Sequence, residues 1–108
     1  MTPGPGRPTV SVVIPVLDDA PALEGCLAAL AAQTRAPDEV IVVDNSPGAA
    51  DEATAALARG AGARVVRETR RGVGAASAAG YDEARGTVIA RLDADSRPAP
   101  DWVETALR

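Results

Sequence analysis

Three pairs of polar residues, each placed directly after an apolar run, are the groups of this sequence whose types and spacing could do chemistry. They are Asp18 with Asp19, Asp44 with Asn45, and Asp93 with Asp95. Carboxylate and amide oxygens bind divalent cations or the polar parts of a ligand. A lone Asp-x-Asp is weak evidence, because Asp is a common residue and the motif often arises by chance. The pairs therefore gain meaning only if the fold brings them together.

The apolar runs before these pairs have the composition of buried strands. Residues 9–16 read T-V-S-V-V-I-P-V and residues 40–43 read V-I-V-V. Such β-branched runs are typical of strands that are covered on both faces. Residues 64–68 alternate apolar and polar side chains, which predicts a third strand nearer a sheet edge. Residues 88–92 form the fourth predicted strand.

A helix is predicted between the first two strands. Apolar residues from Leu23 to Leu30 recur at helical spacing, and this pattern ends near Gln33. Asp18 and Asp19 fit the start of this helix as capping residues. Their place directly after a strand also keeps a ligand-binding role open.

Three further helices are predicted over residues 50–59, 74–84 and 98–107. The middle one consists almost entirely of small residues, which suits a helix that lies tight against a sheet or a ligand. Trp102 is the expected anchor of the last helix.

The strict alternation of strands and helices predicts an α/β fold. The sheet should be mostly parallel, with helices on both of its faces. In such sheets ligands bind beyond the carboxyl ends of the strands, so the three polar pairs should gather at one edge. Like charges gathered there repel one another, and a divalent cation would relieve the repulsion.

The composition excludes several functional classes. The chain has 108 residues, of which 46% are hydrophobic. This predicts one domain, 9–108, after a disordered Pro/Gly-rich tail, 1–8. A net charge of −4 with 2% aromatic residues argues against a nucleic-acid partner. The absence of His excludes Ser-His-Asp and Cys-His catalysis within this chain. The single cysteine, Cys26, excludes an internal disulfide and a zinc cluster, and is expected in the core.

No segment of the sequence has the features of membrane targeting. The first eight residues lack the apolar stretch of a signal peptide, and no run approaches the ~18 apolar residues of a membrane span. We therefore expect a cytoplasmic location, with membrane association only through segments outside this sequence.

From Val10 onward, the chain resembles the nucleotide-binding half of a family 2 glycosyltransferase with the GT-A fold. The matching segments, in order, are V-S-V-V-I-P-V-L-D-D at 10–19, L-A-A-Q-T at 30–34, D-E-V-I-V-V-D-N-S at 38–46, R-G-V-G-A-A-S-A-A-G at 71–80, A-R-G-T-V-I-A-R-L-D-A-D at 84–95 and P-D-W-V at 100–103. No single segment is specific, but six in the right order and spacing make a strong match. The resemblance implies a Rossmann-like sheet with strand order 3-2-1-4.

The resemblance also implies which residues bind a nucleotide-diphosphate sugar. Asp44 corresponds to the family's base-recognising Asp, for which the base is typically uracil, and Asp93 corresponds to an acid near the ribose. Asp95, helped by Asp93, would hold the Mg²⁺ or Mn²⁺ that is bound to the diphosphate and acts as a Lewis acid on the leaving group. The implied donor-binding set is Pro15, Val16, Asp18, Asp44, Asn45, Gly72, Gly74, Asp93 and Ala94.

The arginine pair Arg70 and Arg71 lies just before the Gly-rich segment. Either residue would add positive charge near the diphosphate, and a solvated surface position explains the pair equally well. The complete family fold covers the fourth strand with later strands. In this chain we therefore expect 88–92 to be an unpaired apolar edge.

The chain departs from the family pattern in two places and in length. Asn45 stands where the family often has a second Asp, and Ser77-Ala78 stand where it often has Arg-Asn. These positions commonly lie close to the nucleotide, so they leave the base and the sugar open. The sequence stops about where the family's acceptor half begins, and the catalytic base is expected beyond Arg108. The isolated chain is therefore expected to be inactive.

Two hypotheses follow about the activity. In the first, the chain is the donor-binding part of an enzyme that transfers a sugar from a UDP-sugar to the hydroxyl of an unknown acceptor. In the second, it is a shortened module that binds nucleotide and metal without catalysis. A dinucleotide site at Gly72-Val73-Gly74 is excluded because this segment follows the third strand and Ser77 stands where Gly is required. A receiver domain is excluded because that family relies on a Lys, which this chain lacks.

Overall fold

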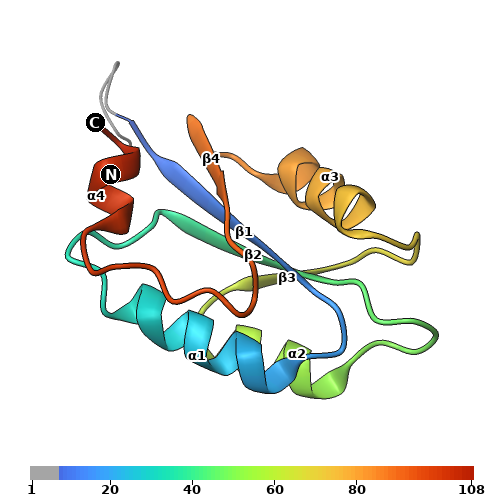
Figure 1. The fold of residues 1–108 in the computed structure, drawn as a ribbon. Helices are drawn as coiled ribbons and strands as arrows, with labels where there is room; N and C mark the ends of the chain where they lie inside the picture. Colours follow the sequence, from blue (N-terminus) through green and yellow to red (C-terminus); the bar gives the residue numbers. More distant parts are fainter. Residues whose placement is uncertain (1–7) are drawn as a thin grey trace.

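The computed structural model describes residues 8–108 and shows a four-stranded sheet with helices on both faces (Figure 1). The elements are β1 Val10–Val16, α1 Ala20–Ala31, β2 Glu39–Asp44, α2 Glu52–Gly60, β3 Arg64–Arg67, α3 Val73–Glu83, β4 Val88–Arg91 and α4 Trp102–Ala106. The predicted α/β alternation is confirmed.

The strand order β3-β2-β1-β4 is the predicted one, and all neighbouring strands run parallel. β1 lies inside the sheet, where it pairs with β2 as far as Val16↔Asp44 and with β4 as far as Val13↔Arg91. The carboxyl ends of the strands therefore lie along one edge. The three polar pairs identified in the sequence lie at this edge, at the ends of β1, β2 and β4 or in the loops that follow them.

The two faces of β1 support two hydrophobic clusters, because successive side chains of a strand point to opposite sides. Val10, Val12, Ile14 and Val16 pack toward the side of α1, α2 and α4. Val13 packs on the other side, with residues of β2 and α3. Six of the seven residues of β1 are buried, which confirms that this strand is covered on both faces.

Helix α3 lies close to the sheet because its inward side chains are small. A Cβ atom added to Gly80 would lie 2.2 Å from Cγ1 of Val13 and 3.1 Å from Cγ2 of Val43. Ala76 and Ser77 are also buried on this side. The predicted tight packing of a small-residue helix is therefore confirmed, and the sheet is its partner.

The last helix is shorter than the predicted 98–107. Residues that precede a proline avoid the helical region, and this chain has Pro98 and Pro100 in succession. The carbonyl of Pro100 instead accepts a hydrogen bond from the amide of Thr34 at 2.8 Å. The helix starts only at Trp102, which packs half-buried against the core, while Val103 is fully buried.

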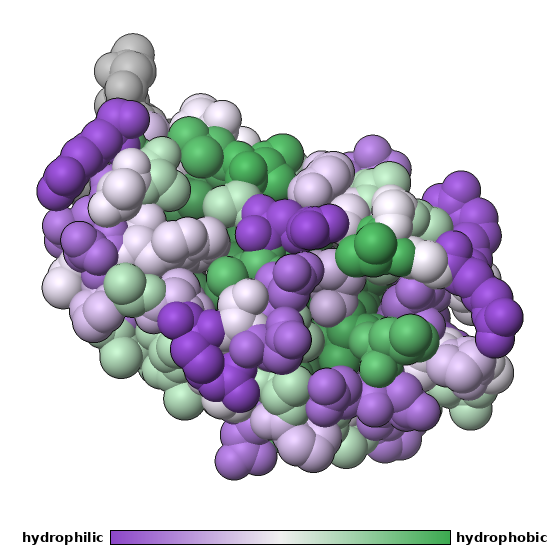
Figure 2. Space-filling view, in the orientation of Figure 1, coloured by the Kyte–Doolittle hydropathy of each residue, from purple (hydrophilic) through white to green (hydrophobic). Residues whose placement is uncertain are grey.

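Strand β4 has only β1 beside it among residues 8–108, which confirms the predicted edge position. Ile89 is 44% exposed there, and Figure 2 shows an apolar area over this part of the molecule. The predicted disordered tail 1–8, except for Pro8, lies outside the described residues. In the described part of the chain, the helices are too short or too polar to cross a membrane.

Two glycines of α3 provide a matched test of this packing. We expect Gly80→Ala to lower the free energy of unfolding by about 1–3 kcal/mol, since the new methyl group overlaps Val13 and the core yields little. Gly74→Ala adds a methyl group in open space, so it should leave stability unchanged or raise it by up to about 1 kcal/mol through helix propensity. Urea unfolding followed by circular dichroism measures both, and equal effects would contradict the packing argument.

Candidate functional site

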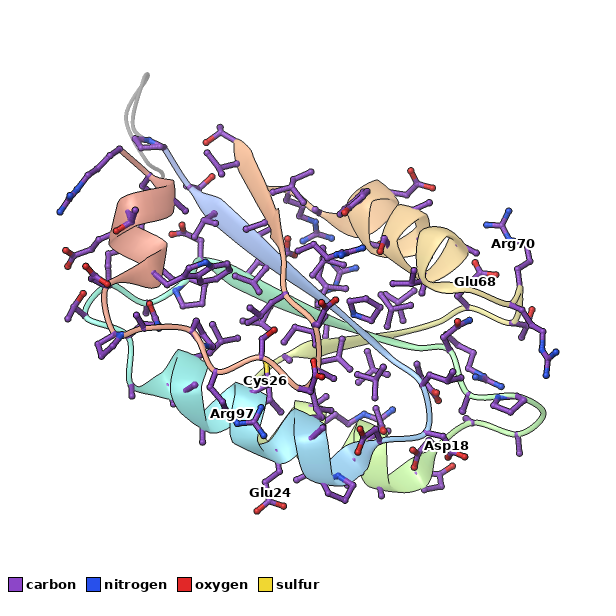
Figure 3. All side chains as sticks on the ribbon, viewed as in Figure 1. Asp18, Glu24, Cys26, Glu68, Arg70 and Arg97 are labelled. Carbon is purple, nitrogen blue, oxygen red and sulfur yellow. The ribbon has the colours of Figure 1, made fainter. Side chains whose placement is uncertain are left out.

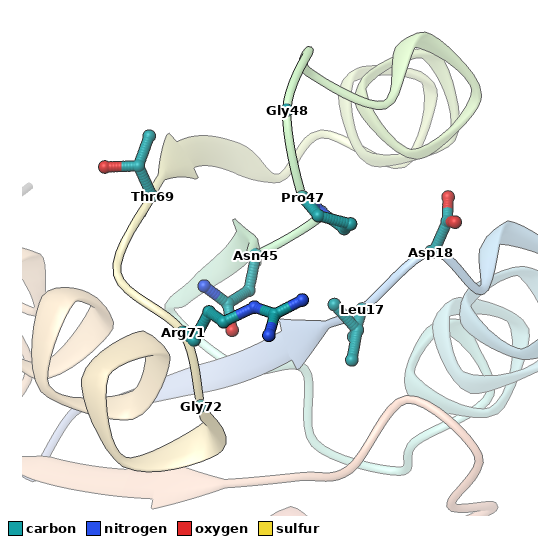
Figure 4. Close-up of a pocket in the computed structure, with 8 residues that line it drawn as sticks. All are labelled: Leu17, Asp18, Asn45, Pro47, Gly48, Thr69, Arg71 and Gly72. Atoms are coloured by element: carbon teal, nitrogen blue, oxygen red, sulfur yellow. The ribbon is translucent and has the colours of Figure 1, made fainter.

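A pocket of about 530 Å³ opens at the carboxyl ends of β1, β2 and β3 (Figure 4). Its lining comes from three loops: Leu17 and Asp18 after β1, Asn45, Pro47 and Gly48 after β2, and Thr69, Arg71 and Gly72 between β3 and α3. A smaller pocket of about 110 Å³ shares Leu17, Asn45 and Gly72 with it. The two pockets therefore adjoin at the edge where ligands bind in parallel α/β sheets.

The structure brings five of the predicted donor-binding residues to these pockets. Pro15 and Val16 line the small pocket, Asp18 lines the large pocket, and Asn45 and Gly72 line both. Gly74 lies in the first turn of α3 and lines neither of them. Leu17, Pro47, Gly48 and Thr69 are lining residues that sequence reasoning missed, because nothing in their type distinguishes them from ordinary loop residues.

The acidic pair after β1 is divided between two roles. Asp19 caps α1, since its carboxylate accepts a hydrogen bond from the amide of Ala22 at 3.3 Å. Asp18 lines the large pocket and has a φ angle of 53°. This left-handed conformation is uncommon for a residue other than glycine, although Asp tolerates it better than most. The capping interpretation is therefore confirmed for Asp19, and Asp18 remains a candidate for ligand binding.

Asp44 is buried and organises the loop after β2. Its carboxylate accepts hydrogen bonds from the amides of Ser46 at 3.0 Å and Asp51 at 2.8 Å, and from the Ser46 hydroxyl. Arg67 lies 3.4 Å from the same carboxylate. Burial acts to raise the pKa of Asp44, but these donors and Arg67 together outweigh it and lower the pKa. Asp44 lines neither pocket, and its predicted role in base recognition stays a prediction.

Asn45 and Arg67 connect the loops that form the pocket walls. The Asn45 amide nitrogen donates to the carbonyls of Glu68 and Arg70, each at 2.7 Å. In the opposite direction, Arg67 donates to the carbonyls of Ser46, at 2.8 Å, and Gly48. Sequence reasoning missed Arg67, because in the sequence it is only the polar residue at the end of an alternating strand.

The structure separates the two arginines that the sequence left equivalent. Arg70 pairs with Glu68, with 3.0 Å between its Nε and Oε1 of Glu68, and its side chain projects outward, 74% exposed (Figure 3). Arg71 lines the large pocket. Among residues 8–108, its guanidinium makes no hydrogen bond or ion pair. Arg71 is therefore the cation that this pocket offers to a ligand.

Asp93, Ala94 and Asp95 lie on the loop after β4, with both carboxylates exposed. Oδ1 of Asp93 lies 3.6 Å from Nη2 of Arg91. In the described part of the chain, no group of three or more acidic, His or Cys residues could hold a metal ion. Two exposed carboxylates nevertheless fit Mg²⁺ or Mn²⁺, because Mg²⁺ commonly takes one or two protein carboxylates and completes its shell with water and phosphate oxygens.

The Arg97 side chain lies between the backbone of this acidic loop and α1. Arg97 donates to the carbonyls of Ala94 at 3.3 Å and Ser96 at 2.9 Å. Its guanidinium lies beside α1 (Figure 3). A Cβ added to Gly25 of this helix would come within 2.2 Å of Nη2. A glycine at this position in α1 therefore makes room for the arginine. Sequence reasoning missed this contact, because a lone glycine inside a helical pattern carries no sign of a distant partner.

Cys26 also contacts the acidic loop, since its thiol donates to the carbonyl of Asp93 at 3.7 Å. Burial raises the pKa of Cys26 to about 11, with smaller contributions from Asp95 and Asp93, while Arg97 acts to lower it. The thiol is therefore neutral at physiological pH. Cys26 is fully buried, and its prediction as a core residue is confirmed.

A parallel sheet with this strand order, a pocket at its carboxyl edge and acidic loops beside it define an α/β protein of the nucleotide-binding class. A sequence profile described as "Glycosyl transferase family 2" matches residues 11–108, so the chain belongs to glycosyltransferase family 2. The glycosyltransferase AglE of Haloferax volcanii is 32% identical over 105 residues, which cover 90% of this chain and 34% of AglE. The uncharacterized glycosyltransferase EpsJ of Bacillus subtilis is 33% identical over 93% of this chain and 28% of EpsJ.

Solved structures agree with this assignment and with the GT-A fold. The mannosyltransferase PcManGT of Pyrobaculum calidifontis, in complex with GDP-Man and Mn²⁺, is 31% identical with a TM-score of 0.76. The match covers 95% of this chain and 32% of that one. Glucosyl-3-phosphoglycerate synthase of Mycobacterium tuberculosis, with Mn²⁺, UDP and glucosyl-3-phosphoglycerate, is 28% identical with a TM-score of 0.68, over 86% of this chain and 36% of that one. The chain thus spans about a third of the relatives that it matches.

The environment of Asp44 predicts a pH-dependent contribution to stability. Asp44→Asn replaces two acceptor oxygens by an amide, which leaves at least one buried donor without a partner, and should cost about 1–3 kcal/mol at pH 7. The folded-state pKa is depressed, so the wild-type carboxylate stabilises the fold above its unfolded value of about 3.9 and loses this contribution as the pH falls through the folded pKa.

The stability difference between wild type and Asp44→Asn should therefore shrink below about pH 4. Thermal unfolding from pH 7 to pH 3 measures it. Asp101→Asn is the matched control, because Asp101 is exposed and makes no side-chain capping bond. A difference that stayed constant over this range would contradict the argument.

Proposed function

We propose that this chain is the donor-binding part of an enzyme that transfers a sugar from a nucleotide-diphosphate sugar, specifically a UDP-sugar, to an acceptor hydroxyl. The observation that carries the proposal is the pocket at the carboxyl edge of the sheet, which residues from three loops line and into which Arg71 brings an unpaired positive charge. Family membership supports the reaction class. The two solved relatives named above bind GDP-Man or UDP, each with Mn²⁺.

In this proposal the base lies beside Pro15 and Val16, at the small pocket, and Asp44 recognises it. The carboxylate of Asp44 already accepts three hydrogen bonds from within the chain. A carboxylate has about four acceptor positions. One acceptor position, on Oδ2 of this buried carboxylate, has no donor within the described chain, and the proposal assigns it to an N–H group of the base, such as that of uracil. Asn45 and Gly72, which line both pockets, complete the walls.

The diphosphate belongs nearer the acidic loop. Asp93 lies near the ribose, and Asp95 with Asp93 holds Mg²⁺ or Mn²⁺, which when bound acts as a Lewis acid on the leaving nucleoside diphosphate. Arg71 adds positive charge to the same anion. Arg97 donates to the carbonyls of Ala94 and Ser96 within this loop.

The residue that removes the acceptor proton is proposed to lie beyond Arg108. Transfer to a hydroxyl with inversion needs a carboxylate base opposite the leaving group, and none of the residues assigned above has that role. The isolated chain is therefore proposed to bind donor and metal without transferring sugar. The competing hypothesis, a module that binds nucleotide without catalysis in any context, is not favoured by relatives that are themselves glycosyltransferases.

The two neighbouring arginines give a matched test of the pocket. Arg71→Ala should weaken UDP binding about tenfold or more, since a hydrogen bond to a charged group is worth about 1.5–3 kcal/mol. Arg70→Ala removes the same charge from a side chain that pairs with Glu68 and points away, and should change the affinity less than about twofold. Isothermal titration calorimetry with UDP and Mn²⁺ measures both. Equal losses would show that only net charge matters and that the pocket is not the site.

The metal role is tested at Asp95. Asp95→Ala should abolish the Mn²⁺-dependent part of UDP binding, because one of two proposed carboxylate ligands is lost. Asp101→Ala removes an exposed carboxylate six residues further along the chain and should have no such effect. The same titration with GDP compares the bases, and tighter GDP binding would make the uracil assignment wrong while the donor site remained. Donor hydrolysis or transfer by the wild-type chain would contradict the proposal that it lacks the catalytic base.

A further inference from the structure

Asn45 has a bonding pattern that a carboxylate could not reproduce. Its amide nitrogen donates two hydrogen bonds of 2.7 Å, to the carbonyls of Glu68 and Arg70, and its backbone amide donates to the carbonyl of Val16 at 2.8 Å. The residue is 8% exposed, so these bonds are shielded from water. The side chain of Asn45 thus joins the loop after β2 to the segment after β3, while its backbone amide continues the pairing with β1.

The connection between the loops after β2 and β3 runs in both directions. While Asn45 donates to the second loop, Arg67 at the end of β3 donates to the carbonyls of Asp44, at 3.2 Å, and of Ser46 and Gly48. Carbonyl oxygens of the loop after β3 thus accept from Asn45, and carbonyl oxygens of the loop after β2 accept from Arg67. Both also contribute residues to the lining of the large pocket.

The segment that Asn45 holds is the one that leads to Arg71. The carboxylate of Glu68 also fixes this segment, since it accepts from the backbone amide of Arg70 at 2.7 Å. With both carbonyls and the amide engaged, the chain reaches Arg71 and then Gly72, whose φ angle of 111° turns it into α3. Several hydrogen bonds thus fix the backbone before Arg71, and the Arg71 side chain lines the pocket (Figure 4).

We propose that Asn45 is a positioning residue that fixes the 68–72 segment, so that Arg71 extends into the pocket before the donor arrives. This inference rests on the proposed function. An Asp at this position would have no N–H to donate and would set a carboxylate against two carbonyl oxygens. The departure of this chain from the family's frequent second Asp therefore has a physical consequence. Asn45 holds the 68–72 segment by two hydrogen bonds, whereas the carboxylate of an Asp would repel the two carbonyl oxygens.

The test is Asn45→Asp, which changes the side-chain volume little. UDP affinity should fall about tenfold, as for Arg71→Ala, because the segment no longer holds the arginine in place. In a double-mutant cycle, Asn45→Asp in the Arg71→Ala background should lower the affinity less than twofold further, since the positioned group is already gone. A purely structural role would instead add its full loss to that of Arg71→Ala.

Gln33→Glu is the matched control. The Gln33 amide also donates to two backbone carbonyls, of Ala99 at 2.7 Å and Ala29 at 3.4 Å, but it lines neither pocket. The same amide-to-carboxylate change there should lower the melting temperature and leave UDP affinity within twofold. An equal loss of affinity in Gln33→Glu would show that the effect is one of general stability and would overturn the inference.

Hydrogen exchange without nucleotide gives a second measurement that is independent of the donor. Amides of 68–72 should exchange at least tenfold faster in Asn45→Asp than in wild type; if Asn45→Asp fails to fold, Asn45→Ala takes its place. Unchanged exchange, or unchanged UDP affinity, would overturn the positioning role while the proposed function stood. If the wild-type chain did not bind UDP at all, the proposed function would fail, and with it the role of Asn45 toward the donor.

Discussion

The burial of β1 on both faces is the constraint on which the rest of the structure depends. Its side chains alternate between the cluster shared with α1, α2 and α4 and the cluster shared with α3, and its two edges pair with β2 and β4. Every layer therefore meets at this strand. Val16, Asp44 and Arg67, the last residues of β1, β2 and β3, lie opposite one another in the sheet, so the loops after these three strands emerge together and line one pocket.

The elements that the sequence predicted well are those that local patterns determine. The β-branched runs of β1 and β2, the helical spacing from Leu23 to Leu30 and the Asp19 cap all depend on neighbours within a few residues. Strand order came from the family resemblance instead. The start of α4 was misplaced because Pro98 looked like a first helical residue, whereas Pro100, with its carbonyl bound by Thr34, delays the helix.

The parts of the site that could not be predicted are contacts to backbone carbonyls. Asn45 binds two carbonyls beyond β3, Arg67 binds carbonyls beyond β2, and Arg97 binds carbonyls of its own loop while lying over Gly25. A carbonyl group belongs to every residue, so residue type carries no information about which one is used. Only the folded path of the loops decides it. The sequence could name Asn45 as a candidate but could not say what it holds.

The acidic residues at the carboxyl edge repel one another less than their clustering in the sequence indicates. Mutual repulsion of the acids was one argument for a cation there. The structure relieves much of that repulsion internally, since Asp44 accepts from Ser46 and Asp51, Asp19 caps α1, and Asp93 lies near Arg91. Among the described residues of this edge, Asp18, Arg71 and Asp95 keep side chains without a hydrogen bond or ion pair. The side chains without a partner are thus two carboxylates and one guanidinium. The proposed donor site adds to them the exposed carboxylate of Asp93 and the remaining acceptor position of Asp44.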